Sequence, residues 1–391
     1  MTFSTVTGRL ADLGGAKWQV HERAAEMARA GRDVIRLTIG EPDTAAPEAL
    51  IADTAAALAA GRTAYSNGRG EAGLRAALAT QYTARRGRAF TPEQVICLPG
   101  TQTALYAVMA ALVEAGDEVL VGDPMYATYE GVIRATGAGM VPVPLRPERG
   151  FRMDAGDLAA RITARSRAIL LNTPHNPTGA VLTAEDIAAI GAVAAAHDLW
   201  IVVDEVYEEL VFEGVEFVSP LADPALAERV IAVSSISKSH AAPGLRSGWC
   251  VGPQAFIEAL LPLAEVMLFG NQPFIADATE AAIRRGSEVA AGMRARFAAR
   301  AAALARVLEA DGALRVHRPQ AGMFAMVDVS ATGISGAAWA DDLLAERGVA
   351  VMPGAAFGET LDSWVRVALT VEDARLGEAA GRMAAHARIR A

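Results

Sequence analysis

Short apolar runs alternate with segments of helical periodicity through the middle of the chain. Runs of four or five apolar residues predict buried strands, for example at 95–98, 199–203 and 230–233. Between such runs, apolar residues recur every three or four positions, which predicts helices. Strands that alternate with helices in this way predict an α/β fold with a large, doubly wound and mostly parallel sheet over residues 45–290.

The pattern changes near residue 305, where strands and helices no longer alternate regularly. The remaining chain predicts strands at 314–317, 323–329, 349–352 and 364–369 and helices at 336–347 and 372–389. This mixture is typical of a smaller α+β unit. Ahead of the large sheet, the amphipathic segment at 8–31 predicts a helix and the apolar run at 34–39 predicts a strand.

Composition and charge argue against several classes of protein. The 391 residues carry a formal net charge of −9, which disfavours nucleic acid or an anionic membrane as a partner. The two cysteines, Cys97 and Cys250, both lie in apolar runs, so neither a disulfide framework nor a metal site is expected. The sequence has no apolar window of 18 residues and no signal-peptide core, so we expect a cytoplasmic location.

A lysine follows the apolar run 230–233 within the stretch Ser-Ser-Ile-Ser-Lys-Ser-His, residues 234–240. Lysine is rarely buried unless it is paired or used, and desolvation lowers its pKa. A neutral amine is the form that attacks a carbonyl. Lys238 is therefore a candidate nucleophile, although a solvated loop lysine would also fit the position.

Two further charged residues stand in apolar surroundings. Asp204 ends the strand predicted at 199–203, and a buried carboxylate is costly unless a cation such as a protonated pyridine nitrogen meets it. Arg366 lies within the run 364–369, where its planar fork can hold a carboxylate through two parallel bonds. The alternatives are a helix cap for Asp204 and a structural salt bridge for Arg366.

Several turns could hold other parts of a ligand. Pro99-Gly100-Thr101-Gln102 joins a strand to a helix at 104–113, and free N–H groups at such a helix start attract anions, although it could be an ordinary turn. Gly40 follows a strand and lets a ligand approach the backbone, or it serves turn geometry alone. Tyr126 follows the strand at 118–122, where it could stack on a flat ring or pack in the core.

Together these motifs resemble the class I/II aminotransferases, which are fold-type I enzymes that use pyridoxal phosphate. The resemblance includes Ser-x-Ser-Lys with Gly244 and Arg246 six and eight residues after the lysine, Asp-x-x-Tyr about thirty residues before it, and the Asn-Pro-x-Gly bend at 176–179. It covers nearly the whole chain. It implies a large domain over 45–290 and a small domain in which residues 1–44 pack with residues 291–391.

The resemblance also implies roles for individual residues. Lys238 would form a Schiff base with pyridoxal 5′-phosphate and move the proton, Asp204 would pair with the ring nitrogen, and Tyr207 and Asn176 would contact the ring oxygen. The cofactor-binding set is Lys238, Thr101, Gln102, Tyr126, Asn176, Asp204, Tyr207, Ser235, Ser237, Arg246 and Tyr65. Gly40, Asn176 and Arg366 would bind the substrate carboxylate.

In the family, the tyrosine that matches Tyr65 reaches across a homodimer interface to the partner's cofactor phosphate. Tyr129 matches a packing position and His175 a position without a chemical role. The implied activity is ping-pong transfer of an amino group from an amino acid to a 2-oxo acid.

The substrate is a separate question. The stretches 16–21, 123–129, 171–179, 196–200 and 234–240 look like those of arginine–pyruvate transaminases. Ala242-Pro243 and Leu245 depart from the usual family residues, which puts the shape of the pocket in doubt. Aspartate, aromatic or biosynthetic aminotransferases therefore remain alternatives, and so does a β-elimination lyase on the same fold.

Overall fold

The computed structural model of the protein describes residues 2–11, 13, 15–310 and 312–390. Residues 1, 12 and 14 of the predicted N-terminal segment, and residues 311 and 391 of the predicted C-terminal part, lie outside the described residues. In the rest of the chain, no helix is long and apolar enough to cross a membrane.

Helices and strands follow the order of the predicted pattern closely. The helices are α1 (Thr5–Ala11), α2 (Gly15–Arg29), α3 (Glu48–Ala59), α4 (Ala72–Arg86), α5 (Thr101–Leu112), α6 (Tyr129–Thr136), α7 (Ala155–Ala159), α8 (Ala184–Ala196), α9 (Ile236–Ser239), α10 (Gln254–Leu268), α11 (Pro273–Arg285), α12 (Ala290–Leu308), α13 (Gly336–Arg347) and α14 (Asp373–Arg390). The strands are β1 (Ile35–Leu37), β2 (Val95–Leu98), β3 (Glu118–Asp123), β4 (Gly139–Pro144), β5 (Ser166–Asn172), β6 (Trp200–Asp204), β7 (Val230–Ser235), β8 (Gly248–Val251), β9 (Arg315–His317), β10 (Phe324–Asp328), β11 (Val349–Pro353) and β12 (Trp364–Ala368).

The larger sheet has seven strands in the order β2-β8-β7-β6-β5-β3-β4. Strand β8 runs antiparallel to both of its neighbours, and the other pairs are parallel. Because successive side chains point to opposite faces, Ile201 and Val203 pack into one core layer and Val202 into the other. Helices α4, α7, α8 and α11 share the first layer, and α5, α6 and α10 share the second. This is the predicted doubly wound arrangement.

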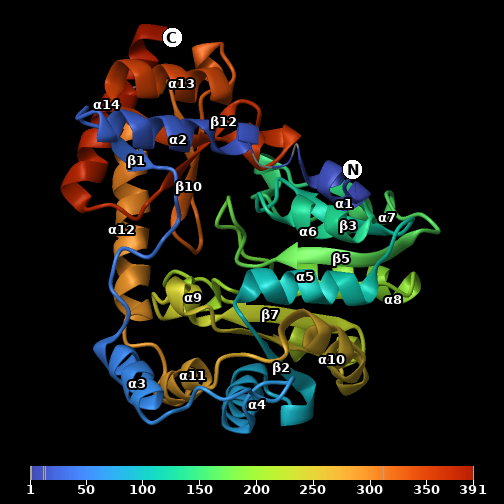
Figure 1. The fold of residues 1–391 in the computed structure, drawn as a ribbon. Coiled ribbons are helices and arrows are strands. Elements are labelled where there is room, and N and C mark those ends of the chain that lie inside the picture. Colours follow the sequence, from blue (N-terminus) through green and yellow to red (C-terminus); the bar gives the residue numbers. More distant parts are fainter. Residues whose placement is uncertain (1, 12, 14, 311, 391) are drawn as a thin grey trace.

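The smaller sheet has five strands in the order β1-β11-β12-β10-β9. Its first strand comes from the N-terminal segment and pairs in parallel with β11, so that Ile35 lies opposite Val349. Helix α2 packs against β11 and α13, and Figure 1 shows this N-terminal helix (blue) beside the C-terminal helices (orange and red). Figure 1 also shows α12 running along one side of the molecule, from the small sheet to the level of α9.

Two predicted boundaries were wrong. The segment 8–31 forms two helices: α1 ends at Ala11, and α2 begins at Gly15. The helix predicted at 104–113 begins three residues earlier, at Thr101. The earlier start places Thr101 and Gln102 in the first helical turn, next to Gly100.

Candidate active site

A cavity of about 210 Å³ lies between the small sheet and the carboxyl ends of strands in the large sheet. Open parallel sheets generally bind ligands at this edge. Twelve of the thirteen residues that the sequence singled out line the cavity: Gly40, Thr101, Gln102, Tyr126, Asn176, Asp204, Tyr207, Ser235, Ser237, Lys238, Arg246 and Arg366. The structure places Tyr65 elsewhere, as described below.

Lys238 enters the cavity from α9, the single turn that follows β7. Its Nζ donates a hydrogen bond to the backbone carbonyl of Gly40 over 2.8 Å. Burial lowers the pKa of Lys238 to about 8, although the charge of Glu41 opposes this shift. With a pKa near 8, a minority of the amine is already neutral near physiological pH, and this neutral form is the nucleophile.

Asp204 ends β6 and is buried. Its Oδ2 accepts a hydrogen bond from the hydroxyl of Tyr129 at 2.8 Å, and its Oδ1 accepts one from the Val206 N–H at 3.1 Å. Burial raises the pKa of Asp204 to about 6, while these two hydrogen bonds act in the opposite direction. Tyr129, which the sequence assigned to packing, is therefore also a direct partner of this carboxylate.

An asparagine at the end of β5 connects two of the candidate residues. Asn172 donates from Nδ2 to the backbone carbonyl of Asp204 at 3.0 Å, and its Oδ1 accepts from the Asn176 N–H at 2.7 Å. Tyr207 is buried beside Asn176, and burial raises the pKa of its hydroxyl well above its usual range. The hydroxyl of Tyr207 therefore keeps its proton and can donate it in a hydrogen bond.

Arg366 lies in β12 with its guanidinium buried between two aromatic rings. The centre of the guanidinium is 4.0 Å from the ring centroid of Phe324 and 4.4 Å from that of Phe357. Nη1 donates to Oδ1 of Asn176 at 3.1 Å, and Nη2 donates to the carbonyl of Thr38 at 2.6 Å. Within the described residues, the buried Nε has no hydrogen-bond partner and no carboxylate pairs with the guanidinium. The structural salt bridge considered as an alternative is therefore not found among these residues.

Hydroxyl and amide groups gather in the part of the cavity where α5 begins. The hydroxyl of Thr101 donates to Oγ of Ser235 at 2.9 Å, and Ser235 Oγ also accepts from the Ser237 N–H at 3.3 Å. Gln102 accepts through Oε1 from the hydroxyl of Thr128 at 2.8 Å. The first N–H groups of α5 have no intrahelical partner, so this end of the cavity is suited to an anion.

Gly100 and Arg246 fit together closely at this end. Gly100 has φ +85°, and a Cβ built on it would lie 2.3 Å from Nη2 of Arg246. Arg246 is exposed and itself has φ +51°, a conformation that arginine rarely adopts. Its Nη1 donates to the carbonyl of Pro243 at 2.7 Å. Glycine at position 100 is therefore favoured by its backbone conformation, and it leaves space that the guanidinium fills.

Tyr65 lies outside the cavity of its own chain. Its side chain is 85% exposed, and its ring packs edge-on against Phe269 with 4.9 Å between the centroids. Phe269 belongs to the short connection between α10 and α11. Tyr65 therefore contributes nothing to this subunit's own site.

Some residues of the cavity carried no functional signal in the sequence. Phe324 and Phe357 look like ordinary core residues, and only the fold brings them to the cavity wall. Asn172 did carry a usable signal, because it is a polar residue at the end of an apolar strand, as Asp204 is.

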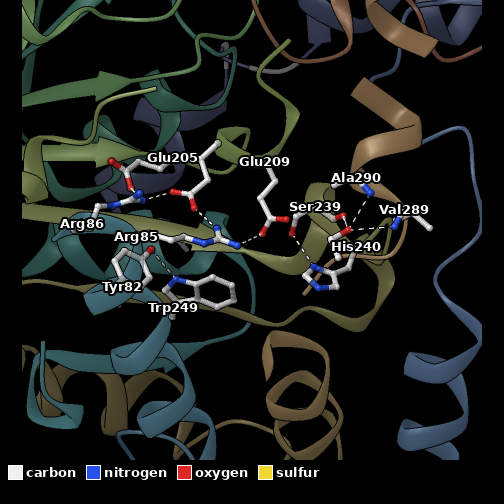
Figure 2. Close-up of polar contacts among 12 residues, drawn as sticks. Tyr82, Arg85, Arg86, Glu205, Glu209, Ser239, His240, Trp249, Val289 and Ala290 are labelled. Atoms are coloured by element: carbon white, nitrogen blue, oxygen red, sulfur yellow. Dashed lines mark hydrogen bonds and ion pairs between the residues drawn. The ribbon is translucent and has the colours of Figure 1, made fainter. Parts of the chain in front are cut away.

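A cluster of ion pairs includes Glu205 of the 204–207 turn and two arginines of α4, Arg85 and Arg86 (Figure 2). Glu205, the neighbour of Asp204, accepts a hydrogen bond from Arg86 at 2.9 Å, and both side chains are at most 5% exposed. Glu208 joins this pair to Arg85, which also contacts Glu209 at 3.0 Å. The cluster ties the end of α4 to the turn that carries Asp204 and Tyr207.

Comparisons with known proteins agree with this geometry. The profile described as aminotransferase class I and II matches residues 32–383. The chain is 43% identical over 384 residues to an arginine–pyruvate transaminase of Pseudomonas aeruginosa, with 98% of each chain covered. It is 34% identical over 371 residues to an aspartate/prephenate aminotransferase of Thermus thermophilus, with 93% and 94% covered. The solved structure of the Thermus thermophilus aspartate aminotransferase with maleate matches with a TM-score of 0.92 at 32% identity, over 99% of this chain and 100% of that one.

The chain therefore belongs to the class I and II aminotransferase family and is an enzyme that depends on pyridoxal phosphate. This finding confirms the predicted family, fold and cofactor. The residues present fit the cofactor: a lysine amine, a buried carboxylate for a ring nitrogen, and hydroxyl and N–H groups for a phosphate all face one cavity. The described residues include no cluster of three side chains suited to a metal ion.

Proposed function

We propose that the enzyme transfers the α-amino group of arginine to pyruvate in two half-reactions at this one site. The observation that carries the choice of substrates is the 43% identity with an arginine–pyruvate transaminase over 98% of the chain. The relatives that act on aspartate and prephenate are less similar, at 32–34% identity. The amino donor and the oxo-acid acceptor both carry a carboxylate, so one clamp can serve both half-reactions.

In this proposal, Arg366 binds the substrate carboxylate. A buried guanidinium needs an anion, and none of the described side chains provides one. Asn176 and Gly40 border the same part of the cavity, and Asn176 is hydrogen-bonded to Arg366. The rings of Phe324 and Phe357 exclude water from the clamp, which strengthens its charge-assisted bonds.

Lys238 holds the cofactor covalently and, once released, carries the proton. Its lowered pKa suits both roles, because a neutral amine is the nucleophile and an amine with a pKa near the working pH is an efficient base. The bond from Nζ to the Gly40 carbonyl holds the amine beside the part of the cavity assigned to the substrate.

The other candidate residues hold and tune the cofactor, which supplies an electron-accepting ring when it is bound. Asp204 keeps the ring nitrogen protonated, Tyr207 and Asn176 bind the ring oxygen, and Tyr126 stacks on the ring. The residues assigned to the phosphate end are Thr101, Gln102, Ser235, Ser237 and Arg246. Support for this assignment comes from their placement around one end of the cavity and from the free N–H groups of α5.

We further propose that the enzyme is a cytoplasmic homodimer in which Tyr65 reaches the cofactor phosphate of the partner subunit. Support comes from two exposed aromatic rings that pack against each other, Tyr65 at 85% exposure and Phe269 at 63%. Exposed aromatic side chains of this kind usually mark an interface. We also retain the proposed division into a large domain over 45–290 and a small domain of 1–44 and 291–391.

A matrix of donors and acceptors tests the substrate assignment. Arginine, aspartate and phenylalanine are each supplied with pyruvate or 2-oxoglutarate, and the oxo-acid and amino-acid products are measured by mass spectrometry. We expect the highest kcat/KM for arginine with pyruvate, with alanine as a product. Preferential use of aspartate with 2-oxoglutarate would overturn the arginine assignment, and ammonia with pyruvate formed without an acceptor would indicate a lyase instead.

A further inference from the structure

Four hydrogen bonds to its side-chain and backbone oxygens hold Asp204 in place. Its two carboxylate oxygens accept from the hydroxyl of Tyr129 and from the backbone N–H of Val206, at 2.8 and 3.1 Å. Its backbone carbonyl accepts from Nδ2 of Asn172 at 3.0 Å and from the Thr173 N–H at 3.1 Å. Of the two groups that hold the carboxylate itself, the Tyr129 hydroxyl is the one that a side-chain substitution can remove.

Tyr129 reaches this carboxylate from another part of the sheet edge. It is the first residue of α6, which follows β3, and its side chain is 1% exposed. The ring packs edge-on against Tyr126, with 5.5 Å between the centroids. Burial and the charge of Asp204 raise the pKa of the phenol well above its usual range, so the hydroxyl stays protonated and donates.

The hydroxyl counteracts the effect of burial on Asp204. Burial favours the neutral acid, whereas a hydrogen bond to the ionised carboxylate favours the charged form. A ring nitrogen can be paired with Asp204 only if the carboxylate is ionised and points into the cavity. A fixed donor on Oδ2 supplies both conditions, because it stabilises the charge and restricts rotation of the carboxylate.

We propose that Tyr129 is a positioning residue that acts through Asp204, holding its carboxylate ionised and aimed at the ring nitrogen of the cofactor. The inference rests on the proposed role of Asp204. Tyr129 itself touches neither the substrate nor the reacting atoms in this assignment. Its effect should therefore appear first in cofactor binding and in the spectrum of the bound cofactor.

The substitution Tyr129→Phe keeps the buried ring and removes the donor. A matched control is Tyr82→Phe, since Tyr82 is 3% exposed and its hydroxyl accepts from Nε1 of Trp249 at 3.0 Å, away from the cavity lining (Figure 2). Both variants lose one buried hydroxyl with one side-chain partner. A difference between them therefore reports on the partner, Asp204, and not on the loss of a hydroxyl as such.

We expect Tyr129→Phe to weaken binding of pyridoxal phosphate to the apoprotein by about tenfold, which is typical for the loss of a hydrogen bond to a charged group. The pH midpoint of the bound-cofactor absorption should shift, and kcat should fall by a similar factor with little change in KM. Among the described residues, the other titratable groups with an electrostatic effect on Asp204 or from it are Lys238, Tyr126 and Tyr207, and all remain in the variant. Tyr82→Phe should change only the thermal unfolding temperature.

A double-mutant comparison separates positioning from general stability. In an Asp204→Ala background no carboxylate remains, so adding Tyr129→Phe should change cofactor affinity by less than about twofold. An unchanged affinity and absorption midpoint in the single variant, or an equal loss in both backgrounds, would refute the role of Tyr129. If Asp204→Ala itself leaves cofactor affinity and absorption unchanged, the proposed role of Asp204 is wrong as well, so the two failures are distinguishable.

Discussion

The ε-amine of Lys238 donates a hydrogen bond to the backbone carbonyl of Gly40 over 2.8 Å. The lysine follows a strand of the large sheet, whereas Gly40 follows the first strand of the small sheet. The residue proposed to perform the chemistry and the turn proposed to meet the substrate are therefore in direct contact, although they are 198 positions apart in the sequence.

Replacing Lys238 should abolish covalent attachment of the cofactor. The chain contains two lysines, Lys17 and Lys238, so borohydride reduction followed by peptide mapping gives an unambiguous result. We expect the label at Lys238 in the natural protein, no label in Lys238→Ala, and a kcat at least about a thousandfold lower in that variant. The control Lys17→Arg keeps a cation beside Glu130 and should retain both label and activity. Normal turnover by Lys238→Ala would exclude the proposed chemistry.

Attachment of the cofactor to the apoprotein should accelerate as the pH rises through about 8. Burial lowers the pKa of Lys238 to that value, and only the neutral amine attacks a carbonyl. Stopped-flow absorbance at a series of pH values measures this rate. A midpoint near the ordinary lysine value of about 10.4 would show that the amine is solvated.

The same pKa shift affects the stability of the apoprotein. The unfolded chain binds more protons than the folded protein between the lowered pKa, about 8, and the ordinary lysine value. The contribution of Lys238 to the free energy of unfolding should therefore increase as the pH rises through this window. Denaturant titrations of the natural apoprotein and of Lys238→Met check this, because the contribution should be missing in the variant.

Arg366→Lys should weaken use of both substrates. Lysine keeps the charge but loses the planar fork, so we expect kcat/KM to fall by about 10- to 100-fold for the amino donor and for the oxo acid alike. Affinity for pyridoxal phosphate should remain nearly unchanged, since Arg366 is assigned to the substrate. An effect on only one of the two substrates would contradict a shared carboxylate clamp.

The ion pair between Arg86 and Glu205 of the 204–207 turn should contribute strongly to stability. Arg86→Met would leave Glu205 buried without its cation, although Glu208 keeps Arg85, and we expect this to lower the free energy of unfolding by about 3–5 kcal/mol. The exposed ion pairs of Arg375 with Asp33 and Glu378 provide a control, and Arg375→Met should lower the free energy of unfolding much less than Arg86→Met. Urea denaturation of both apoproteins measures these changes in the free energy of unfolding. Equal decreases in the two variants would mean that burial of the Arg86 pair does not increase its contribution to stability.

Complementation between two inactive chains tests the dimer. Tyr65→Ala and Lys238→Ala are co-expressed with different affinity tags, and the mixed dimer is purified through both. If Tyr65 serves the neighbouring subunit, one of the two sites in each mixed dimer is intact, so we expect about half of the natural activity. A mixed dimer as inactive as its parents would show that Tyr65 acts within its own chain, and an active Tyr65→Ala parent would show that Tyr65 has no role in the site.

The sequence was sufficient to predict that certain residues at strand ends lie close together. Asp204 and Lys238 follow unbroken apolar runs, and strand ends in a parallel sheet must meet at one edge, so their proximity follows from the pattern. The helix predicted at 336–347 has the same bounds in the structure, because Ser335 caps its start and Gly348 follows its end.

Contacts between distant segments could not be predicted in the same way. The sequence around Tyr129 predicts only a packing residue, because the carboxylate that it contacts is far away in the sequence. Its hydroxyl reaches Asp204 only because β3 and β6 lie in the same sheet. Phe324 and Phe357 read as core residues for the same reason, and they flank Arg366 only because their segments converge at one end of the small sheet.

The pairing of β1 with β11 also constrains how the protein is made. Ile35 leaves the ribosome early, but its partner Val349 is synthesised more than three hundred residues later. All seven strands of the larger sheet, which end at Val251, are translated in the meantime and can assemble first. Biosynthesis therefore orders the two halves of the catalytic centre: the portion assigned to the coenzyme can take shape during translation, whereas the arginine clamp must await the last stretch of the polypeptide.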